Sequence, residues 1–157
     1  MTCVPEPIVA VLQQLQVLSL AVCHDDIPWA ASTFFAYDDA DRRLLLLSSL
    51  ETRHGELLAS NRRVAGTIAG QFTEIAEIHG LQYYGIARLL ERPQERDRAL
   101  DLYYGRFPQA RGFAAPAWEI RLLRLKLTDN RLGFGTKIQW SRHDTDASAA
   151  PRCATSD

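Results

Sequence analysis

The sequence contains little cysteine, little lysine and no long apolar run, and these shortages exclude several classes of protein. The three cysteines, Cys3, Cys23 and Cys153, form neither a disulfide framework nor a metal-ligand pattern, so a reducing cytoplasm is the expected location. The apolar stretch 8–23 is interrupted by glutamines and is too short and too polar to span a bilayer, which predicts no membrane contact. A formal net charge of -1 offers no basic surface to nucleic acid.

Signatures of the common enzyme sites are missing as well. The four histidines show no pair four residues apart and no cluster with cysteine, so no metal site is predicted. The chain has neither a glycine-rich dinucleotide fingerprint nor a nucleophile elbow. The aspartates at 38–41 lack the glycine and glutamate of a calcium loop and indicate a solvated turn. These patterns therefore identify no catalytic residue.

The composition that remains is that of one ordinary globular domain. A chain of 157 residues with 46% hydrophobic residues is long enough to bury a true core. Residues 1–140 carry the periodic apolar patterns, whereas residues 141–157 are small and polar. We therefore assign residues 1–140 to a single domain and expect residues 141–157 to form a disordered tail.

Apolar periodicity predicts a mainly β fold. Strands are predicted over residues 17–24, 29–37, 43–49, 63–71, 75–91, 118–127 and 132–140. Helices are predicted over residues 8–15, 52–60 and 93–107. Most consecutive strands lack the crossover helix that a parallel sheet needs, and closure removes exposed edges. The economical architecture is an antiparallel β-barrel with peripheral helices.

Two irregularities are expected within these strands. In the strand over 118–127, the alternation of apolar and charged residues changes phase at Leu122 and Leu123. A one-residue slip moves side chains to the other face, so an extra residue or a barrel corner is expected there. Gly80 interrupts the strand over 75–91 and predicts a second bulge or corner, and Gly66 predicts a close approach of backbones or a bend.

The most informative stretch lies over residues 44–61, where an apolar strand ends in hydroxyls and a helix begins. Free N–H groups at a helix start, nearby hydroxyls and a guanidinium together suit a phosphate. The alternative is that a hydroxyl only caps the helix and the arginine points into water. The candidate phosphate ligands are Ser48, Ser49, Thr52, Arg53 and His54.

The segment LSSLETRHGELLASNRRV, residues 47–64, resembles the phosphate-binding segment of the FMN-binding split-barrel superfamily, best known from pyridoxamine phosphate oxidase. Ser48 matches the strand-end hydroxyl of that family, and Thr52, Arg53 and His54 match its Ser/Thr-Arg-Lys run. The segments HGLQYYGIARLL and WEIRLLRLKLTDNRLGFGTKIQW resemble its uncharacterised bacterial YhbP-like branch. The resemblance implies a split β-barrel of the FMN-binding type, with FMN at a homodimer interface.

The chain departs from the oxidase at three places. The oxidase has an arginine and a lysine on the strand that corresponds to residues 29–35, where this chain has neither. Its Arg-Leu-His substrate motif is replaced by Leu-Gly-Phe-Gly at 132–135, and His54 stands where the family has lysine. A true pyridoxamine phosphate oxidase is therefore not predicted. Two alternatives remain: an FMN-dependent oxidoreductase with a small-molecule electron donor or acceptor, or a non-catalytic module that binds flavin, haem or deazaflavin.

Four further residues are candidate cofactor contacts. The amides of Gln71 and Gln82 suit the donors and acceptors of a flavin ring edge, with an ordinary exposed strand amide as the alternative. Trp118 suits a flat cofactor, but a tryptophan in a strong strand more often belongs to the core or an interface. Lys137 follows a glycine pair that lets it approach an anion, with a surface lysine as the alternative.

Overall fold

The computed structural model describes residues 3–142. The predicted tail over 141–157 lies outside the described residues, apart from Ser141 and Arg142. Within the described range, no helix combines the length and the apolar character needed to cross a membrane.

The element order follows the predicted order closely. The helices are α1 (Glu6–Gln14), α2 (Arg53–Ser60) and α3 (Pro93–Arg106), and short 3₁₀ turns cover Ile75–Glu77, Pro108–Gly112 and Asn130–Leu132. The strands are β1 (Val17–His24), β2 (Ile27–Phe34), β3 (Ala36–Asp38), β4 (Arg43–Leu47), β5 (Arg63–Ala69), β6 (His79–Leu89), β7 (Ala117–Asp129) and β8 (Thr136–Ser141).

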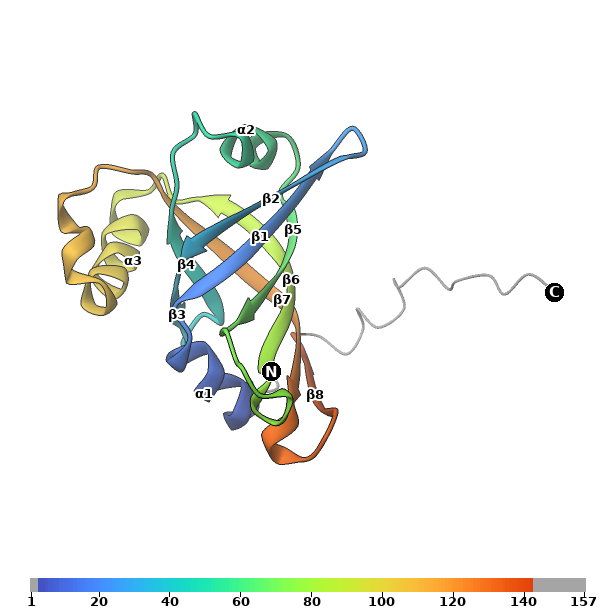
Figure 1. Ribbon diagram of the computed structural model, residues 1–157. Helices are drawn as coiled ribbons and strands as arrows, with labels where there is room; N and C mark the ends of the chain where they lie inside the picture. The colour runs from blue at the N-terminus through green and yellow to red at the C-terminus, as the bar shows by residue number, and fades with distance from the viewer. Residues whose placement is uncertain (1–2, 143–157) are drawn as a thin grey trace.

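All eight strands form one antiparallel sheet that curls into a split barrel, which confirms the predicted fold class (Figure 1). The strand order is β2-β1-β5-β6-β7-β4-β3, and β8 pairs with the second half of the long strand β7. The edge strand β2 contacts β4 without pairing with it, so the barrel is split between these two strands. In Figure 1, α2 lies over the upper end of the barrel, α1 lies at the lower end and α3 lies beside β4.

Two hydrophobic clusters hold this arrangement. The larger cluster fills the barrel with alternate residues of the strands and with the apolar side of α1, for example Ile8 and Leu12. The smaller cluster lies outside the barrel, where Ala99, Tyr103 and Phe107 of the α3 region cover Leu45. Strand β4 is therefore buried on both faces, which explains its unbroken run of leucines.

The predicted phase change in β7 is a β-bulge. Tyr84 of β6 pairs with Arg124, but the next residue, Gly85, pairs with Leu122, so Leu123 is the extra residue. A Cβ atom on Gly85 would lie 2.5 Å from the carbonyl oxygen of Arg121, so the backbones approach closely at the bulge. The irregularity predicted at Leu122 and Leu123 is confirmed.

Three other expectations were wrong. No bulge is present at Gly80, which pairs regularly with Ala69 of β5 and Thr128 of β7. The extra residue of the bulge lies in β7 and is opposite Gly85. The strand predicted over 75–91 begins only at His79, after the 3₁₀ turn. The single strand predicted over 29–37 is divided: the chain leaves β1 after Phe34 and pairs with β4 from Ala36 onward.

Candidate cofactor site

The predicted phosphate site lies where β4 ends and α2 begins, and we call residues 48–54 the β4–α2 corner. Thr52 is the N-cap of α2: its hydroxyl oxygen accepts the N–H of Gly55 at 3.2 Å. The same hydroxyl donates to the carbonyl oxygen of Ser49 at 2.8 Å. Thr52 thus fixes the start of the helix, in agreement with the alternative that a hydroxyl caps it. The N–H groups of Arg53 and His54, the first two of the helix, have no acceptor inside it.

A second set of contacts ties the helix start to the strand end. The hydroxyl of Ser48 and Nε2 of His54 form a hydrogen bond of 2.6 Å, and Nε2 also lies 3.2 Å from the hydroxyl of Thr52. Burial lowers the pKa of His54, because desolvation disfavours the imidazolium. His54 is therefore neutral at neutral pH and contributes polarity rather than charge to the corner.

Arg53 provides the only cation of the β4–α2 corner. Its side chain is 50% exposed and its guanidinium forms an ion pair of 3.3 Å with Glu56, one turn along α2. Exposed pairs of this kind are worth about 0–1 kcal/mol, so a stronger anion can replace Glu56 at little cost. Ser49 is partly exposed and accepts the N–H of Glu51 at 3.2 Å.

Trp118 supports the corner from inside the barrel. The residue is only 4% exposed and belongs to the main core, as the core alternative expected. Its indole N–H donates to the carbonyl oxygen of Ser48 at 3.1 Å. The tryptophan therefore anchors the end of β4 from a position beneath it.

Gln82 and Lys137 lie on the outer face of the sheet. Gln82 pairs with Lys126, which pairs in turn with Gln139, and these side chains line a hollow of about 360 Å³ together with Tyr84 and Trp140. Lys137 lies two residues before Gln139 on the same face of β8 and is exposed. Gln71 follows the end of β5 and is exposed.

One chain does not bring the two groups of candidates together. Leu89, at the far end of β6, pairs with Trp118 beneath the corner. Gln82 lies seven residues before Leu89, which is about 23 Å at about 3.3 Å per residue. The corner and the outer-face hollow are therefore separate surfaces of the molecule.

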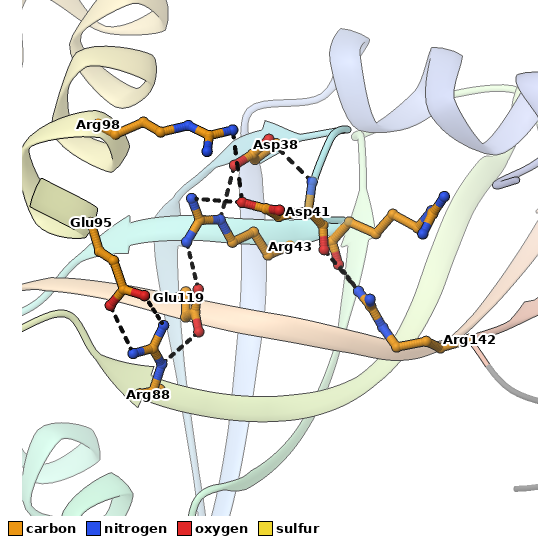
Figure 2. A network of polar contacts seen from close by, with 9 residues as sticks. Asp38, Asp41, Arg43, Arg88, Glu95, Arg98, Glu119 and Arg142 are labelled. Carbon is orange, nitrogen blue, oxygen red and sulfur yellow. Dashed lines mark hydrogen bonds and ion pairs between the residues drawn. The ribbon is translucent and has the colours of Figure 1, made fainter. Parts of the chain in front are cut away.

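A buried ion network beneath α3 is the largest polar feature that the sequence analysis missed (Figure 2). Arg43, 7% exposed, donates to Asp38 at 2.9 Å and to Glu119 at 2.7 Å. Arg88 donates to Glu119 at 2.7 Å and to Glu95 of α3 at 3.0 Å. Burial acts against the charge of Arg43, but these hydrogen bonds outweigh it and raise its pKa.

Arg142 extends the network at the end of the described chain. Its guanidinium donates to the carbonyl oxygens of Leu122, Asp41 and Arg42 at 2.7, 2.9 and 2.6 Å, and burial lowers its pKa. Arg43 itself could have indicated this network from the sequence. A charged residue at the start of a strand that is buried on both faces requires a buried partner of opposite charge. Because every network carboxylate is bound by arginine, we regard the network as structural.

Comparisons with known proteins match most of the chain rather than one motif. The family described as pyridoxamine 5′-phosphate oxidase matches residues 4–128. The UPF0306 protein YhbP of Salmonella paratyphi A is 44% identical over 131 residues, which cover 83% of this chain and 88% of that protein.

Two solved structures share the fold at lower identity. A heme binding protein from Mycobacterium smegmatis superposes with a TM-score of 0.72 at 18% identity, covering 89% of this chain and 60% of that chain. A FAD-binding protein from Mesorhizobium loti gives a TM-score of 0.63 at 18% identity, covering 81% of this chain and 95% of that chain. At these identities the likeness concerns the fold.

Proposed function

The chain belongs to the pyridoxamine 5′-phosphate oxidase family and to its UPF0306 relatives, and from that premise we propose that it binds FMN through the β4–α2 corner. The observation that carries the proposal is the start of α2. Its capping by Thr52 leaves the N–H groups of Arg53 and His54 without intrahelical acceptors, beside a half-exposed guanidinium. This set of donors fits a phosphate dianion.

Each corner residue has a distinct part in this proposal. Arg53 exchanges Glu56 for the phosphate oxygens, and the dipole of α2 adds to the attraction. Thr52 and Trp118 position the corner without touching the ligand, through the cap and through the bond to the Ser48 carbonyl. Ser48 and Ser49 supply hydroxyls at the strand end. A positioned cap keeps the N–H groups aimed at one point, which favours binding of a single phosphate.

The outer face of the sheet suits the flavin ring of a second copy. Amides of Gln82 and Gln139 supply donors and acceptors, and Lys126 supplies a positive charge to the same hollow. Because one chain keeps this hollow far from the corner, we propose a homodimer in which the corner of one copy and the outer face of the other, including Lys137, share the cofactor. The flavin would supply hydride chemistry for a small-molecule electron donor or acceptor. The chain would orient the ring and exclude water.

The missing cations on β2 set the expected strength of binding. On that strand Ala30 is exposed and Ala31 is half-buried, and neither carries a charge, so the phosphate relies on Arg53 and on main-chain N–H groups. We therefore expect FMN to bind more weakly than in a protein that has two further cations at the site. Weak binding favours a carrier or a module that exchanges flavin, and turnover is a separate question.

The visible spectrum of the purified protein and an FMN titration test the proposal. Bound flavin gives bands near about 370 and 450 nm, and NADH or NADPH bleaches them only if the flavin accepts hydride. Arg53→Ala should weaken FMN binding by about 1.5–3 kcal/mol, whereas Arg96→Ala, which removes another exposed arginine, should not. A colourless protein that ignores added FMN, or equal affinity in both variants, would contradict the proposal.

Haem binding is a second candidate function, and His79 favours it. This residue is buried, and its Nδ1 lies 2.8 Å from the carbonyl oxygen of Glu77. Its Nε2 has no hydrogen-bond partner among residues 3–142. An imidazole held at one nitrogen and free at the other is the arrangement of many metal ligands. The Phe72 ring, 4.4 Å from the imidazole, would have to move.

Added hemin should give a Soret band that His79→Ala abolishes, and an absent or unchanged band would exclude this function.

A further inference from the structure

A cavity of about 420 Å³ opens beside α2, next to the β4–α2 corner. Its walls come from the loop before α2, from α2 itself, from the end of β6 and from β7. None of the five candidate phosphate ligands of the β4–α2 corner lines it. The volume lies within the range of small-molecule sites, about 300–1,000 Å³.

Two arginines of this cavity have no counter-ion within residues 3–142. Arg62 and Arg92 line it from two different loops, are exposed, and form no ion pair or side-chain hydrogen bond among the residues that the structure describes. The hydrogen bond from Arg88 is the main cause that lowers the pKa of Glu95. The positive charge of Arg92 contributes to this lowering only by longer-range electrostatic attraction. Two guanidiniums that face one cavity repel each other, and a bound anion would relieve this repulsion.

The remaining charges of the cavity do not neutralise them. Arg88 also lines the cavity, but Glu95 and Glu119 already hold its guanidinium. Glu91 is the only acidic residue of the lining and lies beyond ion-pair distance of both unpartnered arginines. The cavity therefore keeps an excess of positive charge.

The other residues that line the cavity are apolar. Trp118 forms part of this apolar wall, with its ring held in place by the hydrogen bond to the Ser48 carbonyl. Leu50 and Leu89 extend this wall, and Leu50 is 44% exposed although it is apolar. A bare inorganic anion would leave this surface in contact with water, whereas an apolar group attached to the anion would cover it.

We propose that this cavity binds a small organic anion: a phosphate or carboxylate held by Arg62 and Arg92, joined to a flat apolar body that packs on Leu50 and Trp118. The inference goes beyond the proposed flavin site and does not require flavin to bind. The anionic group sets orientation and the apolar wall selects the body of the ligand. A substrate or an effector of the protein would have this chemistry.

Titration with phenyl phosphate, followed by ³¹P NMR, tests the proposal. Arg62→Gln and Arg92→Gln should each raise its Kd about tenfold, because each removes a charge-assisted contact. Arg98→Gln, which removes an exposed arginine of α3 that pairs with Asp41, should leave the Kd unchanged. Added NaCl should weaken binding to the unaltered protein, because salt screens exposed charges.

Three further measurements distinguish this site from the flavin site and from simple anion binding. Arg53→Ala should weaken FMN binding yet leave phenyl phosphate binding unchanged. Leu50→Ser should weaken phenyl phosphate binding but not the weaker binding of inorganic phosphate. The proposal fails if phenyl phosphate does not bind, if the Arg62→Gln and Arg92→Gln variants bind it normally, or if Arg53→Ala abolishes its binding.

Discussion

The polar groups at the two ends of β4 differ in burial and in pairing. At its first residue, Arg43 is buried and paired with three carboxylates, those of Asp38, Asp41 and Glu119, and α3 lies beside this network (Figure 2). Beyond its last residue, the β4–α2 corner presents free N–H groups and a half-exposed Arg53 with one weak ion pair. Both ends belong to the same five-residue strand. The paired Arg43 end holds the strand in place, and the corner end keeps donors available for a ligand.

Buried and exposed arginines have different roles in this protein. A buried charge must be fully paired in the native state, so the network has no capacity left for a ligand. An exposed arginine contributes little to stability and remains available for an anion. The same reasoning applies to Arg62 and Arg92, which are exposed and have no counter-ion among the residues described.

The largest effect is expected at the buried end. Arg43→Met should lower the free energy of unfolding by about 3–5 kcal/mol, because it leaves the buried carboxylate of Asp38 without its arginine and leaves Glu119 with Arg88 alone. Urea denaturation measures this change. Arg53→Met is the matched control and should cost about 0–1 kcal/mol. Equal losses in the two variants would remove the distinction between the ends of β4.

Trp118→Phe tests whether the corner also depends on a buried contact. The substitution keeps an aromatic ring but removes the indole N–H that the Ser48 carbonyl accepts. We expect a loss of about 1–3 kcal/mol in the free energy of unfolding, since a buried acceptor loses its donor. FMN affinity should fall with it, because the end of β4 loses its anchor. An unchanged urea midpoint would mean that water or another donor replaces the indole.

Thr52→Ala removes the cap of α2 and should cost about 1 kcal/mol. Thr52→Ser keeps the hydroxyl and is the control. The affinity for FMN should fall in the alanine variant and remain in the serine variant, because only a capped helix keeps its first N–H groups in place. Circular dichroism during urea denaturation gives the stability, and flavin fluorescence gives the affinity. A serine variant as weak as the alanine variant would argue against a role for the cap.

The sequence predicted local features better than distant ones. The corner lies within residues 48–54, so its hydroxyls, cap and arginine could be recognised from spacing alone. The bulge was equally visible, because Leu123 disturbs the alternation within one strand. Gly80 misled because a single strand does not reveal which residue of its partner lies opposite.

The ion network could not be predicted because its partners are distant along the chain. Arg43 and Glu119 are 76 residues apart and meet only because β4 pairs with β7. Glu119 alternates with apolar residues as an exposed residue would, yet it is buried on the side of β7 where α3 packs. The roles of Gln82 and Lys137 stay predictions for a related reason: they depend on a second copy of the chain.

The smallest effect is a difference in pH dependence between the two ends of β4. Burial lowers the pKa of His54, so the unfolded chain binds a proton more readily than the corner does, and stability should rise with pH around the ordinary histidine value of about 6.5. This contribution is present above that pH and is lost as the pH falls below it. The hydrogen bond from Arg88 lowers the pKa of Glu95, so the contribution of the network persists above the ordinary value of 4.5 and is lost only in stronger acid. Urea midpoints measured between about pH 2 and pH 8 should therefore show two separate steps. His54→Gln should remove the upper step alone, and an upper step that persists in this variant would assign it to another histidine.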